Sequence, residues 1–194
     1  MYHVKNDKRS VRSANLIYNA LRGLMAQKDF EAITVTELVE QAGVGRATFY
    51  RAFDSIDDVL RLKCDQRFEE LTRLMRAQRQ TFSKAGGIQI SPKLFLDFWY
   101  QNSEIITLLT QAYRFEYLLS AFVRLFRALF EQDITSLAPE RFSEYILAMQ
   151  TGAVIGLLMQ WITDGKNIPS DEMADFLENT IVQLEKIHVK NTAG

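Results

Sequence analysis

The sequence contains few of the residues that break helices or cross-link chains. Its 194 residues include one cysteine, three prolines and nine glycines. The single cysteine, Cys64, allows no disulfide within the chain and so favours a reducing compartment. Apolar residues recur at spacings of three and four, and strand-like alternation is almost absent, which indicates helices throughout. We therefore predict an all-α chain of about nine helices.

Segments that would direct the chain to a membrane are also lacking. The first ten residues, MYHVKNDKRS, contain no apolar stretch of the kind found in a signal peptide. The longest apolar run, around 152–159, is far shorter than a bilayer-spanning segment. We expect a cytoplasmic protein with no membrane partner.

Residues suited to catalysis or metal binding are scarce. The two histidines, His3 and His188, both lie near the termini. We can place no Ser/His/Asp or Cys/His arrangement, no phosphate-binding glycine loop and no metal-ligand spacing. His188 is more simply an exposed residue of a last helical turn, and Cys64 a packed one. An enzyme is thus the weaker alternative, and we expect no catalytic residue, no metal and no cofactor.

The charge balance alone gives no attraction to nucleic acid. The chain has 23 Lys and Arg against 24 Asp and Glu, a net charge of −1, so a nucleic-acid binder would need its positive charge concentrated in one place. Lys8, Arg9 and Arg12 cluster at the start of the first expected helix, about 7–27. Cations there oppose the helix dipole. These cations either form an ordinary solvated helix end or belong to a segment that contacts phosphates.

That first helix has a cap and an apolar face. Asn6 or Asp7 suits the N-cap position. Residues at helical spacing form its apolar stripe: Val11, Ala14, Ile17, Leu21 and Leu24.

Residues 33–60 carry the most informative pattern. The segment Thr34-Val35-Thr36-Glu37 is a capping box, with Thr34 as the cap and Glu37 at the third helical position. Ile33 and Leu38 occupy the positions of a hydrophobic staple. Gly43 stands where a left-handed residue would end this helix. A short helix is therefore predicted from about residue 35 to 42.

A second short helix follows almost at once. Gly45 is an acceptable N-cap, and Phe49 and Phe53, one turn apart, should face the core. Two short helices joined by a turn of about three residues form a helix-turn-helix. Arg side chains can bind guanine or phosphate, and Thr and Tyr hydroxyls can donate to phosphate oxygens. The exposed positions of the second helix are Arg46, Ala47, Thr48, Tyr50 and Arg51.

These residues closely resemble the DNA-binding segment of the TetR/AcrR family of transcriptional regulators. The resemblance is carried by Ile33-Thr34-Val35, Gln41-Ala42-Gly43-Val44 and the run from Arg46 to Phe53, and it is sharp over about 13–60. It implies that Thr48 and Tyr50 contact backbone phosphates. Taken singly, Tyr50 and Arg51 could be ordinary surface residues, but the combined pattern favours DNA binding. The predicted DNA-binding residues are Lys8, Arg9, Arg12, Thr36, Arg46, Ala47, Thr48, Tyr50 and Arg51.

The chain departs from the family pattern at two positions. Family members often carry an aromatic residue or His where Ala52 stands, and usually Lys where Ile56 stands, and both help to hold phosphate. Each lost cationic contact should weaken DNA binding and its salt dependence. A helical interaction protein that has lost DNA binding is therefore a second alternative. Salt-dependent binding to random DNA would separate the two.

The rest of the chain is expected to form a second domain. We predict a helix-turn-helix DNA-binding domain over residues 1–54 and a helical ligand-binding and dimerisation domain over residues 55–194. A capped start at Ser55–Asp58 opens a long helix to about residue 82, and Gly86-Gly87 mark a break. Further helices are expected over about 92–102 after the cap Ser91, 103–109, 113–130, 139–163 with a stop at Gly165, and from the cap Ser170 onward.

The last two helices carry more apolar residues than packing against one neighbouring surface requires. Gly152 and Gly156 are four residues apart and would let another helix approach closely. For about half of the apolar positions on these two helices, the alternative to a dimer interface is a core within one subunit. A two-fold dimer would place two recognition helices about 34–36 Å apart on a near-palindromic operator. The predicted dimer-interface residues are Phe142, Tyr145, Met149, Gly152, Gly156, Phe176, Leu177, Thr180, Ile181 and Leu184.

The middle of the chain is rich in aromatic residues, most of which should be core. The family resemblance implies that part of this region encloses a ligand pocket, and Arg114 and Glu116 either orient a ligand or lie on the surface. A small apolar or aromatic molecule would then release DNA through the long helix. Repression is the family default, and activation stays open. The predicted pocket residues are Phe95, Phe98, Trp99, Tyr113, Tyr117, Phe122 and Trp161.

Overall fold

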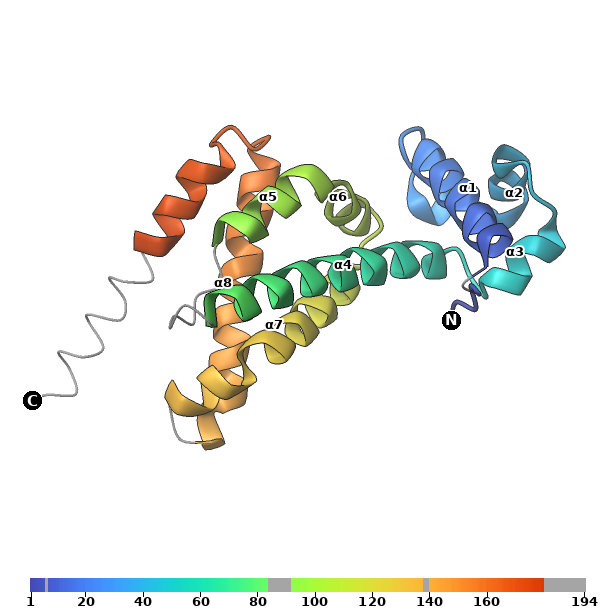
Figure 1. Ribbon diagram of the computed structural model, residues 1–194. Helices are drawn as coiled ribbons and strands as arrows, with labels where there is room; N and C mark the ends of the chain where they lie inside the picture. Colours follow the sequence, from blue (N-terminus) through green and yellow to red (C-terminus); the bar gives the residue numbers. More distant parts are fainter. Residues whose placement is uncertain (6, 84–91, 138–139, 180–194) are drawn as a thin grey trace, which may run out of the picture. The chain divides into compact units, whose positions relative to one another are not determined.

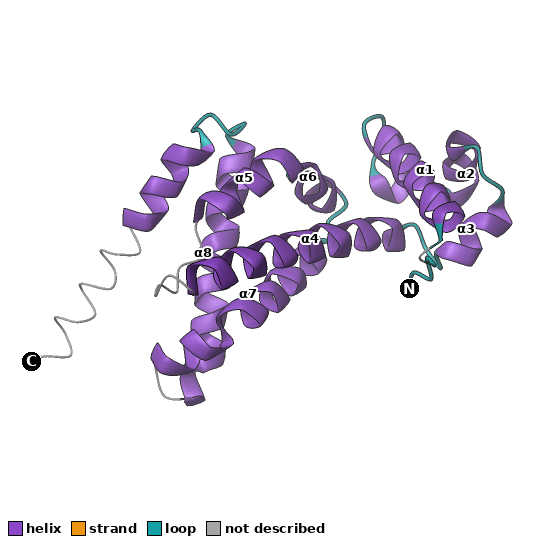
Figure 2. Cartoon of the chain, in the orientation of Figure 1, coloured by secondary structure: helices purple, strands orange, loops and turns teal. Residues whose placement is uncertain are grey.

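The computed structural model describes residues 1–5, 7–83, 92–137 and 140–179, and these residues are organised as helices (Figures 1 and 2). The α-helices are α1 (Lys8–Met25), α2 (Val35–Ala42), α3 (Arg46–Ala52), α4 (Asp57–Ser83), α5 (Pro92–Asn102), α6 (Glu104–Gln111), α7 (Phe115–Leu137) and α8 (Ser143–Thr163). A ninth helical segment covers residues 170–179. Short 3-10 turns lie at Phe30–Ala32 and Glu140–Phe142. The prediction of an all-α fold is confirmed.

The chain divides into two compact units. The head unit contains Met1–Phe68 and Glu104–Phe122, and the body unit contains Glu69–Ser103 and the described residues from Val123 onward. The helix α4 begins in the head unit and continues into the body unit.

The core of the head unit follows the helical spacing read from the sequence. Asp7 caps α1 by accepting a hydrogen bond from the Ser10 backbone N–H at 2.9 Å, as predicted. Of the expected apolar stripe, Val11 is 37% exposed and the other four residues are buried. Val11 lies in the first turn of α1, and the buried stripe of the helix begins only at Ala14. The prediction that Val11 packs inward was wrong.

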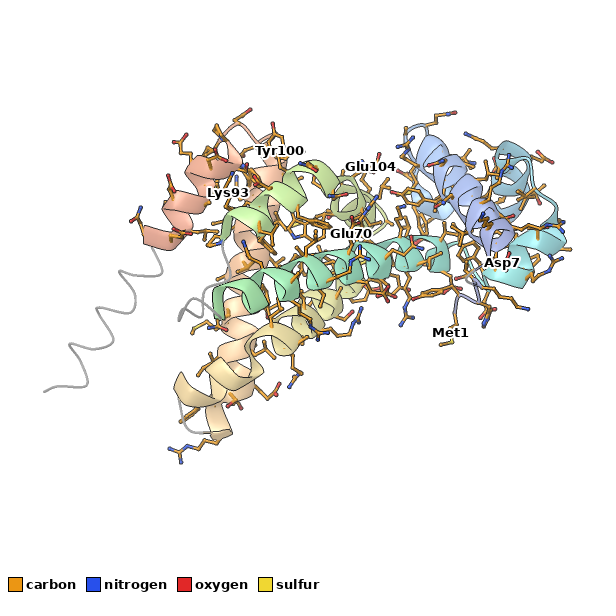
Figure 3. All side chains as sticks on the ribbon, viewed as in Figure 1. Met1, Asp7, Glu70, Lys93, Tyr100 and Glu104 are labelled. Carbon is orange, nitrogen blue, oxygen red and sulfur yellow. The ribbon has the colours of Figure 1, made fainter. Side chains whose placement is uncertain are left out.

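Two side chains from α6 and the segment before α7 bind the helices of the head. Arg114 donates to Asp57 and, at 2.8 Å, to Glu31, and its guanidinium lies 5.3 Å from the centre of the Phe30 ring. Glu104, labelled in Figure 3, accepts hydrogen bonds from Arg22 at 3.1 Å and from Tyr18 at 3.3 Å. Arg114 is therefore occupied by ion pairs within the protein.

The end of α6 corrects the predicted start of the following helix. Tyr113 has a φ of +56°, and the Arg114 backbone N–H donates to the Leu109 carbonyl at 2.8 Å. This is the left-handed closure of a helix C-terminus. Tyr113 thus follows the end of α6, and α7 begins only at Phe115. The helix expected over about 113–130 therefore begins two residues later and extends to Leu137.

In the body unit, α8 ends where the sequence predicted, but the last helical segment begins in a different way from the one predicted. Gly165, which follows the C-cap Asp164 of α8, has a φ of +74°. Ser170, expected as a cap, is the first helical residue, and its hydroxyl donates to Asp97 at 2.5 Å. The Pro169 carbonyl accepts the first helical bond, from the Met173 N–H. The expected features at Gly86-Gly87, Ser91 and Pro139, and three dimer candidates, Thr180, Ile181 and Leu184, lie outside the described residues.

Candidate nucleic-acid interface

The start of α2 is fixed by the capping box that the sequence predicted. The Thr34 hydroxyl accepts from the Glu37 N–H at 3.3 Å, and the Glu37 carboxylate accepts from the Thr34 N–H at 3.0 Å. The Lys28 ammonium donates to the same carboxylate at 2.6 Å. Lys28 and the two Thr34 donors lower the pKa of Glu37 to about 2. The helix therefore begins at a defined residue and keeps a charged cap at neutral pH.

The turn between α2 and α3 is equally well defined. Gly43 has φ +63° and ψ 33°, the left-handed conformation that the sequence pattern required. The Val44 N–H donates to the Val39 carbonyl at 3.0 Å and closes the end of α2. Gly45 then caps α3 with a φ of −75°. The predicted helix-turn-helix is confirmed by these elements.

The short helix α3 has one buried side and one exposed side. Phe49 is fully buried and its ring lies 5.7 Å from that of Phe53, also fully buried. Burying side chains of this size contributes about 1.5–3 kcal/mol each. The ring of Tyr50 meets the Phe49 ring edge-on at 5.3 Å and is itself 50% exposed. On the outer side, Arg46, Ala47 and Arg51 are exposed, and Thr48 is half-buried.

Positive charge gathers on the part of the head unit that contains α1, α2 and α3, residues 1–56. Residues 1–56 hold eight Lys and Arg against six Asp and Glu, a net charge of +2 in a chain of net charge −1. Lys8, Arg9 and Arg12 on α1 are exposed, as is Thr36 in the first turn of α2. Among the described residues of the stretch 1–56, six Lys and Arg side chains take part in no ion pair: Lys5, Lys8, Arg9, Arg12, Arg46 and Arg51.

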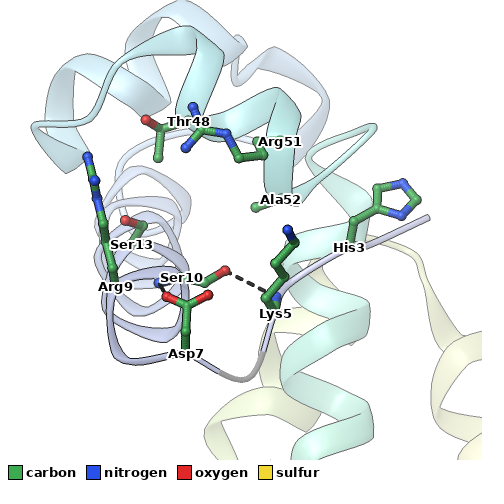
Figure 4. A pocket seen from close by; sticks show the side chains of 9 residues that line it. All are labelled: His3, Lys5, Asp7, Arg9, Ser10, Ser13, Thr48, Arg51 and Ala52. Carbon is green, nitrogen blue, oxygen red and sulfur yellow. Dashed lines mark hydrogen bonds between the residues drawn. The ribbon is translucent and has the colours of Figure 1, made fainter.

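A hollow of about 230 Å³ lies between α1, α3 and the segment before α1 (Figure 4). It brings together three of the predicted residues, Arg9, Thr48 and Arg51. Sequence reasoning missed Lys5, which lines the same hollow and opens the basic run that continues to Arg12. The remaining lining residues are His3, Asp7, Ser10, Ser13 and Ala52.

The two departures from the family pattern have different surroundings. Ala52 is 6% exposed, at the last position of α3, and its small side chain lines the hollow. Ile56 is half-buried, just before α4. Neither side chain carries a charge or a hydrogen-bond donor for phosphate.

The predicted pocket residues are divided between the two units. In the body unit, Phe95, Phe98, Trp99 and Trp161 are buried, and the Phe98 and Trp99 rings meet at 5.2 Å. A pocket shared with residues of the head unit stays a prediction.

The predicted pocket residues of the head unit have three different environments. Phe122 is buried against Phe68, with ring centres 4.7 Å apart. Tyr117 is half-buried beneath the Arg61 guanidinium, 5.6 Å from the ring centre. Tyr113 is 85% exposed. Its place in the left-handed end of α6 turns it to the surface, so its assignment to a pocket is corrected.

A second hollow, of about 660 Å³, lies in the body unit. Trp161 is the one predicted pocket residue that lines it, and Phe176 of the predicted dimer face lines it too. The other lining residues are Leu157, Gln160, Asp164, Asn167, Ile168, Glu172 and Met173.

The helix α8 is apolar on two sides. One side is buried through Leu147, Thr151, Ile155, Leu158 and Trp161. The opposite side is exposed and carries the predicted dimer residues of this helix, Tyr145, Met149, Gly152 and Gly156, with Phe142 just before it. Phe176 is exposed and Leu177 half-buried in the helical segment 170–179.

The length of α8 corrects one expectation. Within the described residues, it is the one helix that is long and apolar enough to cross a membrane by length and composition alone, although 28% of its most apolar stretch is buried. We expected the apolar run at 152–159 to be far too short, but the whole helix has 21 residues. A single helix of this kind is a weak sign of a membrane span, because helices of soluble proteins meet the same test.

Comparisons with known proteins agree with the fold. The model of the bacterial regulatory proteins, tetR family, matches residues 17–62, and that of the transcriptional regulator C-terminal region matches residues 92–183. The solved structure of Lin0861 from Listeria innocua superposes with a TM-score of 0.69 over 94% of this chain and 96% of that one, at 16% sequence identity. The latter likeness concerns the fold.

A helix-turn-helix with cations on its exposed side, followed along the chain by further helices, is typical of DNA-binding regulators of transcription. The chain belongs to the TetR family of transcriptional regulators.

Proposed function

We propose that this regulator is a repressor that binds a near-palindromic operator as a homodimer in the cytoplasm and is released by a small apolar or aromatic molecule. The observation that carries the proposal is the exposed side of α3, where Arg46, Tyr50 and Arg51 stand over a fully buried Phe49. A helix with exposed cations and a hydroxyl on its outer side suits the major groove and its phosphates.

The DNA contact is tested on Tyr50. Selection of bound duplexes from a random pool first yields the operator. We expect Tyr50→Ala to weaken binding to operator and random DNA alike in a gel-shift titration, because a phosphate contact carries no sequence information. Tyr113→Ala removes another exposed tyrosine of the head unit and serves as the control. Undiminished affinity of Tyr50→Ala would remove Tyr50 from the interface.

The dimer is supported by the exposed side of α8. A Cβ atom added at Gly152 or Gly156 would meet no other atom of the chain within 4 Å. Gly152→Leu should therefore leave the fold intact, and the loss of a helical glycine even favours the helix. It should still weaken a dimer in which a second helix approaches this position. Sedimentation analysis measures the dimer, and circular dichroism controls for folding. If the unsubstituted protein sediments as a monomer, the homodimer is refuted.

Release by a ligand rests on reciprocal coupling. A ligand that prefers the form in which the recognition helices are misplaced lowers the affinity of the protein for DNA. Bound DNA must then lower the affinity of the protein for the ligand by the same factor. The helix α4, which runs from the head unit into the body unit, is the proposed lever. A screen of apolar and aromatic compounds for release of bound operator tests this. A saturating ligand that leaves operator affinity unchanged would refute the coupling for that ligand.

One outcome favours a different function. If the protein binds no random DNA even at low salt, it is better described as a helical interaction protein, and the uncharged Ala52 and Ile56 would then account for the loss.

A further inference from the structure

The segment before α1 is fastened to the end of α3. Residues 1–5, here called the arm, run beside residues 52–54, and Tyr2 forms an antiparallel bridge with Phe53. The His3 N–H donates to the Ala52 carbonyl at 2.8 Å, and the Tyr2 hydroxyl donates to Asp65 at 3.0 Å. These contacts join positions 49 to 63 residues apart, so the arm has a fixed course along the head.

The arm alternates between inward and outward side chains. Tyr2 and Val4 are half-buried, while His3 and Lys5 are exposed, as expected for an extended segment lying on a surface. The His3 ring nitrogen Nε2 lies 3.1 Å from the Asp54 carboxylate, so this side chain already has a hydrogen-bond partner within the protein. The Lys5 backbone N–H donates to the Ser10 hydroxyl at 3.1 Å, which places this residue at the hollow beside α1.

Three cations surround this hollow from three separate segments. Lys5 comes from the arm, Arg9 from α1 and Arg51 from α3 (Figure 4). None of the three has an ion-pair partner among the described residues. Asp7 adds one negative charge, and its carboxylate accepts the Ser10 N–H that caps α1. The lining therefore carries an excess of positive charge, with hydroxyl donors at Ser13 and Thr48.

The small side chain of Ala52 leaves this hollow open. We propose that Lys5, together with Arg9 and Arg51, binds one backbone phosphate of DNA here. The arm thereby supplies a cation to the hollow that Ala52 lines. This inference rests on the proposed DNA-binding function and adds the arm to its surface.

The test is the salt dependence of DNA binding by the full chain. Binding of a labelled random-sequence duplex is measured by fluorescence anisotropy between about 50 and 200 mM KCl for the unsubstituted protein, Lys5→Gln and Lys5→Arg. Arg73→Gln is the matched control, because it removes one exposed cation from α4. Loss of one whole phosphate contact lowers the slope of log K against log salt by about 0.9 per subunit, and Lys5→Gln should lower the slope by less than this because Arg9 and Arg51 stay at the same phosphate. The advantage of the unsubstituted protein over Lys5→Gln should therefore shrink by at most about 3.5-fold per subunit across this salt range.

The outcomes distinguish this inference from the proposed function. The expected result is a reduced slope for Lys5→Gln, restoration by Lys5→Arg and no change of slope for Arg73→Gln. If the unsubstituted protein binds DNA and Lys5→Gln retains its full slope, the arm does not contact phosphate and the inference is overturned while the proposed function stands. If the unsubstituted protein binds no duplex at low salt, the proposed function fails and this inference with it.

Discussion

Replacing Gly43 by alanine isolates the conformational cost of the turn between α2 and α3. Gly43 has φ +63°, and a Cβ atom at this position would meet nothing within 4 Å, so the substitution introduces strain without a clash. The left-handed conformation costs a residue with a Cβ about 1–2 kcal/mol. The reduced entropy of the unfolded chain offsets about 0.4–1 kcal/mol of this cost. We expect Gly43→Ala to lower the free energy of unfolding by about 1 kcal/mol.

Urea unfolding followed by circular dichroism measures this change. The midpoint should fall while the slope m stays constant, because the surface exposed on unfolding is unchanged. Gly45→Ser is a control with the opposite expected sign. Gly45 has φ −75° and open space around it, and serine is a better N-cap than glycine. Equal or greater stability of Gly43→Ala would refute the requirement for a left-handed residue.

Three further predictions concern the head unit. Thr34→Ala removes the N-cap acceptor of α2 and should lower the free energy of unfolding by about 1 kcal/mol, measured by urea titration; no loss would mean that the capping box is not formed in solution. The pKa of Glu37 is lowered from 4.5 to about 2, chiefly by Lys28, so its stabilising contribution is full above about pH 4.5 and is lost as the pH falls towards 2. Glu37→Gln should flatten the decline of stability over that range, and an unchanged decline would contradict the assignment. Phe122→Ala opens a cavity beside Phe68 and should cost about 3–5 kcal/mol, and a loss below about 1 kcal/mol would show that this ring contact is not maintained.

Features that depend on residues within one or two helical turns could be predicted from the sequence. The Asp7 cap, the capping box at Thr34 and the glycine turn at Gly43 all lie where the spacing placed them. The burial of Phe49 and Phe53 followed from the same periodicity. Each of these depends on backbone geometry that repeats every few residues, so spacing alone specifies it.

Features made by distant segments could not be predicted. Lys5 reaches the candidate interface because the arm pairs with residues 52–54, and nothing in the spacing along the chain encodes that pairing. Tyr113 was placed in a pocket for its aromatic character, but a positive φ at the end of α6 exposes it. Arg114 is the third case, because its ion pairs join segments that lie 57 and 83 residues away.

The contacts of Arg114 and Glu104 have a practical consequence for dissecting this regulator. A fragment that stops at residue 54 would lack Asp57 and the 104–122 segment, leaving Glu31, Arg22 and Tyr18 without the partners that hold them here. Transferring residues 1–54 to another helical protein would therefore require a host protein that supplies an equivalent arginine and glutamate. The helices that carry the helix-turn-helix thus depend for part of their contacts on Asp57 and on the segment 104–122, or on equivalents that a host would have to provide.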